Sequence, residues 1–217
     1  DRYSYIYWGS NSGYSSTNVC SLPTRGATGN SAADLNCDGY LDIVFSNHRS
    51  ATSHDICSYV YWGTSLGYFP SSRDTLLTHG AYGNSVADLN ADGYLDIVFC
   101  NTRDSGGSYD IHSYIYWGSD TGYSVSNVES LPTQRALEAS IADLNGDGYL
   151  DIVFSNNYNG VTFDIHSYIY WGSASGYSLT NLDSLPTHAA VGNSMADLNS
   201  DGYLDIVFSN YQLPPLY

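Results

Sequence analysis

The stretch DLNADGYLDIVF occupies residues 88–99, and close copies of it stand at residues 34–45, 143–154 and 197–208. The first aspartates of successive copies are 54, 55 and 54 residues apart (88 − 34, 143 − 88 and 197 − 143). A fixed period of this length indicates a repeat architecture. The 217-residue chain is therefore read as four copies of one unit of about 54 residues.

A second pattern, aromatic and ending in Trp-Gly, keeps the same spacing at residues 5–9, 59–63, 114–118 and 168–172. β-Branched and aromatic residues are enriched in this pattern and in the YLDIVF segments, whereas no segment keeps a helical period. In the period that contains residues 88–99, four strands are predicted at residues 83–89, 94–101, 112–118 and 122–131.

Four-stranded units repeated at this length predict an all-β fold, a β-propeller of four-stranded antiparallel blades. A parallel β-solenoid would need a much shorter repeat and is ranked well behind. The whole chain is read as a single repeat domain, residues 1–217, in which one blade is split between the two termini. The predicted repeats cover residues 30–83, 84–138, 139–192, and 193–217 joined with 1–29.

The split blade leaves the mode of assembly open. The two termini can meet within one molecule to close a four-bladed ring, or the end of one chain can complete a blade of another. The second alternative gives either an eight-bladed dimer or a head-to-tail filament, because an exchange that does not close continues from copy to copy. A slice of a longer array is a further alternative. Self-association is therefore expected.

The acidic loop of each copy offers oxygen ligands at relative positions 1, 3, 5, 7 and 9, where position 7 contributes its backbone carbonyl. Glycine at position 6 permits the sharp turn, and Ca²⁺ takes six to eight hard oxygen ligands. About four Ca²⁺ per chain, one per repeat, are therefore expected. The expected ligands are Asp34, Asn36, Asp38, Tyr40 and Asp42; Asp88, Asn90, Asp92, Tyr94 and Asp96; Asp143, Asn145, Asp147, Tyr149 and Asp151; and Asp197, Asn199, Asp201, Tyr203 and Asp205.

Two alternatives compete with this metal site. An EF-hand would need a bidentate glutamate at position 12, where the four copies carry phenylalanine, and its flanks would be helical. A set of Asx-rich hairpin turns without a metal is the other alternative. It is disfavoured because three carboxylates within nine residues repel one another strongly unless a cation is present.

The segment YGNSVADLNADGYLDIVF at residues 82–99, followed by a strand that ends in an aromatic-Gly pair, resembles the FG-GAP/VCBS repeat. That family forms the calcium-loop blades of integrin α-subunit propellers and of many secreted bacterial adhesion-type proteins. The resemblance covers essentially the whole chain and implies that the loop joins the first two strands of each blade. Two departures stand out: Glu138 and Ala139 replace the Gly-Asn pair of the other copies, and four blades replace the usual seven or eight.

The amino-acid composition disfavours some classes of partner and indicates a cellular compartment. The 22 acidic and 6 basic residues give a formal charge of −16, so nucleic acids and anionic membranes are poor partners. No apolar run is long enough to span a bilayer. The abundance of Tyr, Ser, Asn and Gly is typical of extracellular β-structure. Four cysteines allow three disulfide pairings or none, and the sequence does not separate these alternatives: Cys20, Cys37, Cys57 and Cys100.

Binding of a ligand is expected at the rim opposite the acidic loops, where the connections between the second and third strands differ from copy to copy. Aromatic residues precede an aspartate there, a combination that suits a sugar, although a turn-fixing role for these aspartates is the simpler interpretation. The candidate ligand-binding residues are Arg49, His54, Arg103, Tyr109, Phe163 and Tyr217.

The function predicted from these features is a non-catalytic, extracellular, calcium-binding module for adhesion, binding or structural assembly, whose partner is a protein or a glycan at the divergent rim. A carbohydrate-binding lectin on the same scaffold is the alternative. An enzyme is disfavoured, because catalysis normally needs one asymmetric constellation of acid and base groups, whereas these carboxylates recur identically.

Overall fold

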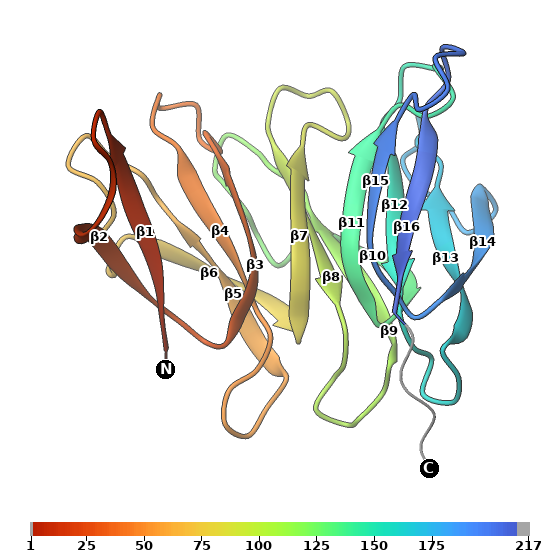
Figure 1. Cartoon of the computed structure of the whole chain (residues 1–217), viewed down its shortest axis with the longest axis horizontal. Coiled ribbons are helices and arrows are strands. Elements are labelled where there is room, and N and C mark those ends of the chain that lie inside the picture. Colours follow the sequence, from red (N-terminus) through yellow and green to blue (C-terminus); the bar gives the residue numbers. More distant parts are fainter. Residues whose placement is uncertain (1, 212–217) are drawn as a thin grey trace.

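The computed structural model describes residues 2–211, which form sixteen β-strands in five antiparallel sheets (Figure 1). Three sheets have four strands each: β3 (Ala27–Ala33), β4 (Asp42–Asn47), β5 (Asp55–Tyr61) and β6 (Arg73–His79); β7 (Ala81–Ala87), β8 (Asp96–Asn101), β9 (Asp110–Tyr116) and β10 (Val128–Gln134); β11 (Ala136–Ala142), β12 (Asp151–Asn156), β13 (Asp164–Tyr170) and β14 (Leu182–His188). Two sheets have two strands each: β1 (Arg2–Ser10) with β2 (Gly13–Thr24), and β15 (Ala190–Ala196) with β16 (Asp205–Asn210). The all-β prediction is confirmed.

The second strand of each four-stranded sheet forms its buried centre. Each of these strands begins with the DIVF segment of the repeat, and every residue of β4, β8 and β12 is buried. A continuous apolar run, rather than an alternating one, is what a strand covered on both faces requires. The same register joins second and third strands in all three sheets, as in the pairing of Ile43 with Tyr61, Val44 with Val60 and Phe45 with Tyr59.

The sheets stand in a row because their first strands, β3, β7, β11 and β15, lie side by side (Figure 1). Hydroxyl groups link neighbouring first strands: the Ser31 hydroxyl donates to the Asn84 carbonyl at 3.3 Å, and the Ser85 hydroxyl to the Ala139 carbonyl at 2.5 Å. Gly83 permits this close approach, because a Cβ there would lie 2.6 Å from the Leu137 carbonyl oxygen.

The predicted β-propeller is wrong. The strands form five separate sheets, and none of the sheets in residues 2–211 is closed or arranged with the others as a ring. β1 and β2 lie at one end of the row, whereas β15 and β16 lie at the other end beside β11 and β12 (Figure 1). The predicted split blade is therefore not assembled within the described chain, and its junction through Asp1 and residues 212–217 lies outside the described residues. The stacking of first strands builds an open row and does not bring its two ends together.

One finer expectation, the extent of a fourth strand, is wrong as well. The fourth strand of the period around residues 88–99 begins at Val128 rather than at residue 122. The intervening segment forms a turn in which the Ser124 hydroxyl accepts a hydrogen bond from the Ser126 N–H group at 3.2 Å, and the Ser124 carbonyl accepts one from the Asn127 N–H group at 3.0 Å. The departure at Glu138 leaves its strand in place, since β11 carries the same bulge as β3 and β15.

All four cysteines are free thiols in this structure: Cys20, Cys37, Cys57 and Cys100. Cys100 is completely buried in the core between the second and third four-stranded sheets. Burial raises the pKa of its thiol, which keeps the group protonated and unreactive. Among residues 2–211 there is also no helix with the length and apolar character needed to cross a membrane.

Candidate functional site: the acidic loops and the opposite rim

The acidic loops between the first two strands of each unit adopt one conformation in all four copies. In the first copy, the Asp34 carboxylate accepts hydrogen bonds from the N–H groups of Asp38 and Gly39, at 3.1 and 2.9 Å. Gly39 has φ of +89°, so the predicted role of glycine at position 6 is confirmed. The equivalent bonds recur in the other loops, through the carboxylates of Asp88, Asp143 and Asp197.

The middle of each loop is held by its third and fifth residues. Asn36 accepts a hydrogen bond from the Asp38 N–H group, and the Asn36 side-chain amide donates to the Asp38 carboxylate, both at 3.1 Å. The other oxygen of Asp38 accepts the Tyr40 N–H group at 2.8 Å. These bonds fix two oxygen-bearing side chains on the exposed side of the turn, next to Asp34.

The aspartate at position 9 has a second role that the sequence reading missed. Asp42, which is completely buried, accepts hydrogen bonds from the Leu35 N–H group at 2.9 Å and from the Gly63 N–H group at 2.7 Å. It therefore ties the acidic loop to the end of the third strand. The same two bonds are made in the next two units by Asp96 and Asp151.

Burial and neighbouring charge both act on these carboxyl groups. Burial, with a contribution from the Asp92 and Asp88 carboxylates, raises the pKa of Asp96 to about 6. The pKa of Asp42 and of Asp151 is raised by the same causes. The two exposed carboxylates of a loop thus lie close enough to the buried one to oppose its ionisation. A cation beside the three groups would relieve this repulsion.

The donor set of each loop fits Ca²⁺ in its chemistry, because it consists of three carboxylates and one amide oxygen. In the conformation described, however, no three His, Cys, Asp or Glu side chains of residues 2–211 converge on a point that would hold a metal ion. The carboxylates are instead turned toward the N–H groups of their own loop. The residues expected to bind calcium are thus gathered in one turn, and their convergence on a cation stays a prediction.

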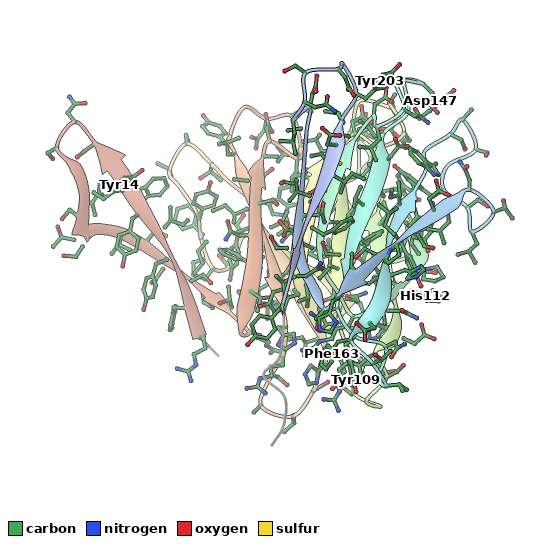
Figure 2. The ribbon with its side chains drawn as sticks, turned by 45° about the vertical axis from the view of Figure 1, so that its right-hand side comes forward. Tyr14, Tyr109, His112, Asp147, Phe163 and Tyr203 are labelled. Carbon is green, nitrogen blue, oxygen red and sulfur yellow. The ribbon has the colours of Figure 1, made fainter. Side chains whose placement is uncertain are left out.

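The expected separation of two rims is confirmed. Asp147 and Tyr203 of the acidic loops lie at one end of the sheets, whereas Tyr109 and Phe163 lie at the other end (Figure 2). The turn between the third and fourth strands joins the acidic rim, as shown by the hydrogen bond of 2.7 Å from the Tyr68 hydroxyl to the Leu41 carbonyl.

Aromatic and basic side chains gather at the rim opposite the acidic loops. The Tyr109 ring centroid lies 5.0 Å from the guanidinium carbon of Arg103 and 5.5 Å from that of Arg135. Tyr158 lies 5.1 Å from Tyr109 and stacks on Phe163 at 4.5 Å. We call these five residues the Arg–aromatic cluster. Three of the residues predicted for this rim, Tyr109, Arg103 and Phe163, are therefore brought together.

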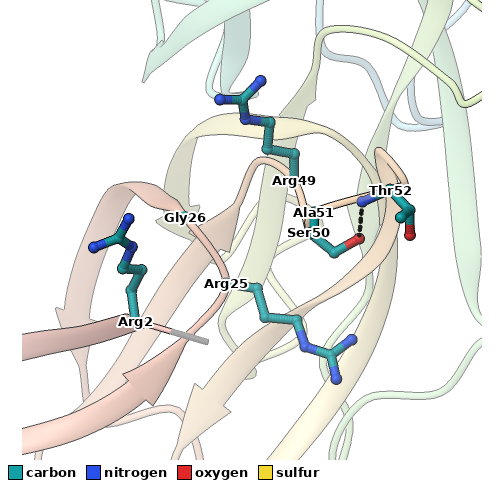
Figure 3. A pocket seen from close by; sticks show the side chains of 7 residues that line it. All are labelled: Arg2, Arg25, Gly26, Arg49, Ser50, Ala51 and Thr52. Atoms are coloured by element: carbon teal, nitrogen blue, oxygen red, sulfur yellow. Dashed lines mark hydrogen bonds between the residues drawn. The ribbon is translucent and has the colours of Figure 1, made fainter.

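A cavity of about 600 Å³ lies at the same end of the sheets, between the first two-stranded sheet and its neighbour. It is lined by Arg2, Arg25 and Arg49, and the Arg25 side chain extends away from the other two (Figure 3). Next to Arg49, burial lowers the pKa of His48 to about 4, and the charges of His54, Arg49 and Arg135 add to this effect. Five of the six arginines are therefore concentrated at this rim, in a chain that is strongly acidic as a whole.

The aspartates predicted to bind a sugar at this rim are partly engaged within the fold. Asp55 accepts a hydrogen bond from the Ser105 N–H group at 3.2 Å and pairs with His79, and Asp164 pairs with His188 in the same way. The simpler interpretation, that these aspartates fix turns, agrees with this geometry. His54 lies against His48, with 5.2 Å between the ring centroids, and burial, together with the charges of Arg103 and Arg49, lowers the pKa of His54. Tyr217 lies outside the described residues.

The sequence reading missed Arg135 and Tyr158. Arg135 has φ of +49°, in the left-handed region, and the corresponding residues of two other copies are Gly26 and Gly80 with similar values. A bulky residue is unusual at such a position. Comparison of the copies in sequence could therefore have identified Arg135, because it replaces a glycine. Tyr158 lies in a connection as long as that of the first copy (157–163 and 48–54), but Arg49 stands at the same place there, so no shared residue type points to Tyr158.

Comparison with known proteins identifies the repeat. The sequence profile described as FG-GAP-like repeat matches residues 88–154 and 143–208, which together span 121 of the 217 residues (208 − 88 + 1). No curated protein matches the chain. Among solved structures, the crystal structure of the V. cholerae biofilm matrix protein Bap1 is similar over 84% of this chain, with a TM-score of 0.50 and 16% sequence identity. The chain spans 28% of that protein's length, and at this identity the likeness concerns the fold alone.

Proposed function

The chain belongs to the FG-GAP-like repeat family, and from this premise we propose that it is a non-catalytic, extracellular module for adhesion or structural assembly whose acidic loops bind Ca²⁺. The observation that carries the proposal is the identical conformation of the four loops. Each loop presents three carboxylates and an amide oxygen within nine residues, and its aspartate at position 9 is hydrogen-bonded to the loop. In three copies this aspartate is buried and also accepts a hydrogen bond from the end of the third strand.

Calcium has a specific structural task in this proposal. The loops concentrate twelve carboxylates at one rim of a chain whose formal charge is −16 (three in each of four copies). Four bound Ca²⁺ would reduce this charge to about −8, which removes much of the repulsion at that rim. The ions would thus hold each loop against its sheet, and the rim opposite would be left for recognition.

Removal of calcium is expected to lower the melting temperature by about 5–10 °C for each ion that is lost. An ion present at 100 times its Kd adds about 2.7 kcal/mol, and for a chain of this size each kcal/mol corresponds to roughly 2–4 °C. The measurement compares thermal melts in excess Ca²⁺, excess Mg²⁺ and EGTA. Asp88→Ala should reduce the Ca²⁺-dependent shift, whereas Asp74→Ala, which removes an exposed carboxylate of β6, should leave it unchanged. Identical melts in Ca²⁺ and EGTA would contradict calcium binding.

Sugar binding at the Arg–aromatic cluster is a second candidate function. The favouring observation is Tyr109, whose ring centroid lies 5.0 and 5.5 Å from the guanidinium carbons of two arginines, together with the Nε atom of Arg103, which is buried without a hydrogen-bond partner in the described residues. An aromatic face and guanidinium groups suit a sugar that carries a carboxylate or sulfate group.

Binding to acidic glycans on an array, abolished by Tyr109→Ala and retained by Tyr14→Ala in the distant β1–β2 hairpin, is the expected result for this second candidate. Tyr14 is a matched control because it is largely exposed and lies far from the Arg–aromatic cluster (Figure 2). Absence of binding to every acidic glycan, or equal binding by both variants, would exclude sugar recognition at this cluster.

A further inference from the structure

Three arginines at the rim opposite the acidic loops form no ion pair within residues 2–211. They are Arg49, Arg103 and Arg135, and each lies in a connection that begins at one of the three four-stranded sheets. The two ion pairs within the described part of the chain each join a histidine to an aspartate. With 22 acidic and 6 basic residues, the chain has carboxylates in large excess. Arginines that gather at one rim without a carboxylate keep their donors open to an anionic ligand.

The fold places all three arginines around one pair of histidines. His48 and His54 lie against each other, with 5.2 Å between their ring centroids. Burial lowers the pKa of both rings. The charges of Arg49 and Arg135 add to this effect at His48, and those of Arg103 and Arg49 add to it at His54. The two histidines are therefore within range of three cationic groups that come from three different connections.

The connections that carry these groups are fixed against one another. A Cβ on Gly80 would lie 3.1 Å from the carbonyl oxygens of both His48 and Arg103, so the first two connections meet there. The Arg135 N–H group donates to the Tyr109 carbonyl at 2.8 Å. The guanidinium carbons of Arg103 and Arg135 lie 5.0 and 5.5 Å from the Tyr109 ring centroid. The arginines are thus positioned before a ligand binds, which limits the entropy lost on binding.

The carboxylate that faces this group is engaged by other donors. Asp55, whose charge acts on His54, accepts the Ser105 N–H group at 3.2 Å and pairs with His79. The Nε atom of Arg103 is buried and has no hydrogen-bond partner in the described residues. A buried donor without an acceptor is costly, and an anionic ligand would supply the acceptor.

We propose that these three arginines form a site for a tetrahedral oxyanion, the sulfate or phosphate ester of a glycan, beside the two histidines. This three-arginine site rests on the second candidate function, sugar binding at the Arg–aromatic cluster, and specifies the acidic group of that sugar. Guanidinium groups from three connections can each donate to a different oxygen atom. A sulfate or phosphate ester presents three terminal oxygens, whereas a carboxylate presents two in one plane.

Titration with inorganic sulfate, phosphate and acetate tests the three-arginine site independently of the sugar. The NMR signals of the His48 and His54 rings should shift with sulfate and with phosphate, and acetate should bind about tenfold more weakly. The pKa of His48 should rise in saturating sulfate, because an anion beside the ring favours its protonated form. Absence of a shift with every anion, equal affinity for sulfate and acetate, or an unchanged pKa of His48 would overturn the proposal.

Arg135→Gly removes one guanidinium group and keeps the backbone conformation. Arg135 has φ of +49°, and glycine stands at the equivalent position of two other copies, with φ of +58° at Gly26 and +56° at Gly80. The variant should weaken sulfate binding by about tenfold. Arg73→Gln is the matched control, because Arg73 stacks on Tyr59 at 4.3 Å and lies at the other end of its sheet, so sulfate affinity should not change. Equal affinities of Arg135→Gly and the wild type would refute the site.

Glycan arrays distinguish a failure of the three-arginine site from a failure of sugar binding. Binding to sulfated or phosphorylated glycans, lost in Tyr109→Ala and weakened in Arg135→Gly, is expected, and the array shows which of the two esters is preferred. Preference for uronic acids over both esters would overturn the three-arginine site and retain sugar recognition at the Arg–aromatic cluster. Sulfate binding in the NMR titration without binding to any glycan would support an oxyanion site and exclude the second candidate function.

Discussion

Replacement of Asp96 by alanine is expected to lower the free energy of unfolding by about 4 kcal/mol. Asp96 is completely buried and accepts hydrogen bonds from the N–H groups of Leu89 and Gly118, both at 2.8 Å. Alanine would leave both donors buried without a partner, and each such group costs about 1–3 kcal/mol. The acidic loop would also lose its connection to the end of the third strand. Urea unfolding followed by tryptophan fluorescence measures the change.

Asp205→Ala is the matched control for this variant. Asp205 occupies the same position in the last unit, but it is only partly buried and accepts a single hydrogen bond, from the Leu198 N–H group at 2.9 Å. Its loss should cost about 1 kcal/mol. Both variants are measured in EGTA, so that no bound cation contributes to the free energy of unfolding. They are also measured at low protein concentration, so that association between chains does not contribute. Equal losses for Asp96→Ala and Asp205→Ala would contradict the role assigned to the contact with the third strand.

Gly83→Ala is expected to destabilise the chain by about 3 kcal/mol, because overpacking in a tight interface typically costs 1–3 kcal/mol. The added Cβ would lie 2.6 Å from the Leu137 carbonyl oxygen of the neighbouring first strand, and a backbone atom cannot move aside without shifting the sheet. The variant therefore tests whether close stacking of β7 against β11 holds the row together. Thermal and urea unfolding report the loss.

Gly192→Ala provides the control for the same substitution in β15. Its Cβ would lie 2.5 Å from a carboxylate oxygen of Glu138 and would meet no backbone atom within 4 Å. That side chain can rotate away, so a loss below about 1 kcal/mol is expected. A loss at Gly192 as large as that at Gly83 would show that the spacing of the first strands is not what makes glycine necessary there.

Local features of the fold were predictable from the sequence because they depend on short patterns. The period of 54 or 55 residues, the apolar DIVF segments and the glycine at position 6 of each loop all lie within single repeats. The β-propeller was wrong because closure depends on how the two ends of the row meet, and no pattern within a repeat fixes that relation. The predicted start of β10 was wrong because the turn at Ser124 interrupts a stretch of high strand propensity.

The candidate site was predictable in its residue types but not in all its contacts. The spacing of the acidic residues identified the loops, whereas the bond between Asp42 and Gly63 joins residues 21 positions apart and leaves no trace in the loop itself. At the opposite rim, variation between copies indicated Tyr109 and Arg103. Arg135 lies in a different connection, between β10 and β11. Its contact with the Tyr109 ring depends on how the strands pack, so neither connection predicts it alone.

The central claim is that the repeated acidic loops hold calcium, and it is tested most directly by counting the ions bound to the purified chain. Equilibrium dialysis against Ca²⁺, with the bound metal measured by atomic emission, should give about four ions per chain, one for each loop. Asp88→Ala combined with Asp92→Ala should reduce the count by about one. A wild-type chain that binds no Ca²⁺ at millimolar concentration would contradict the account.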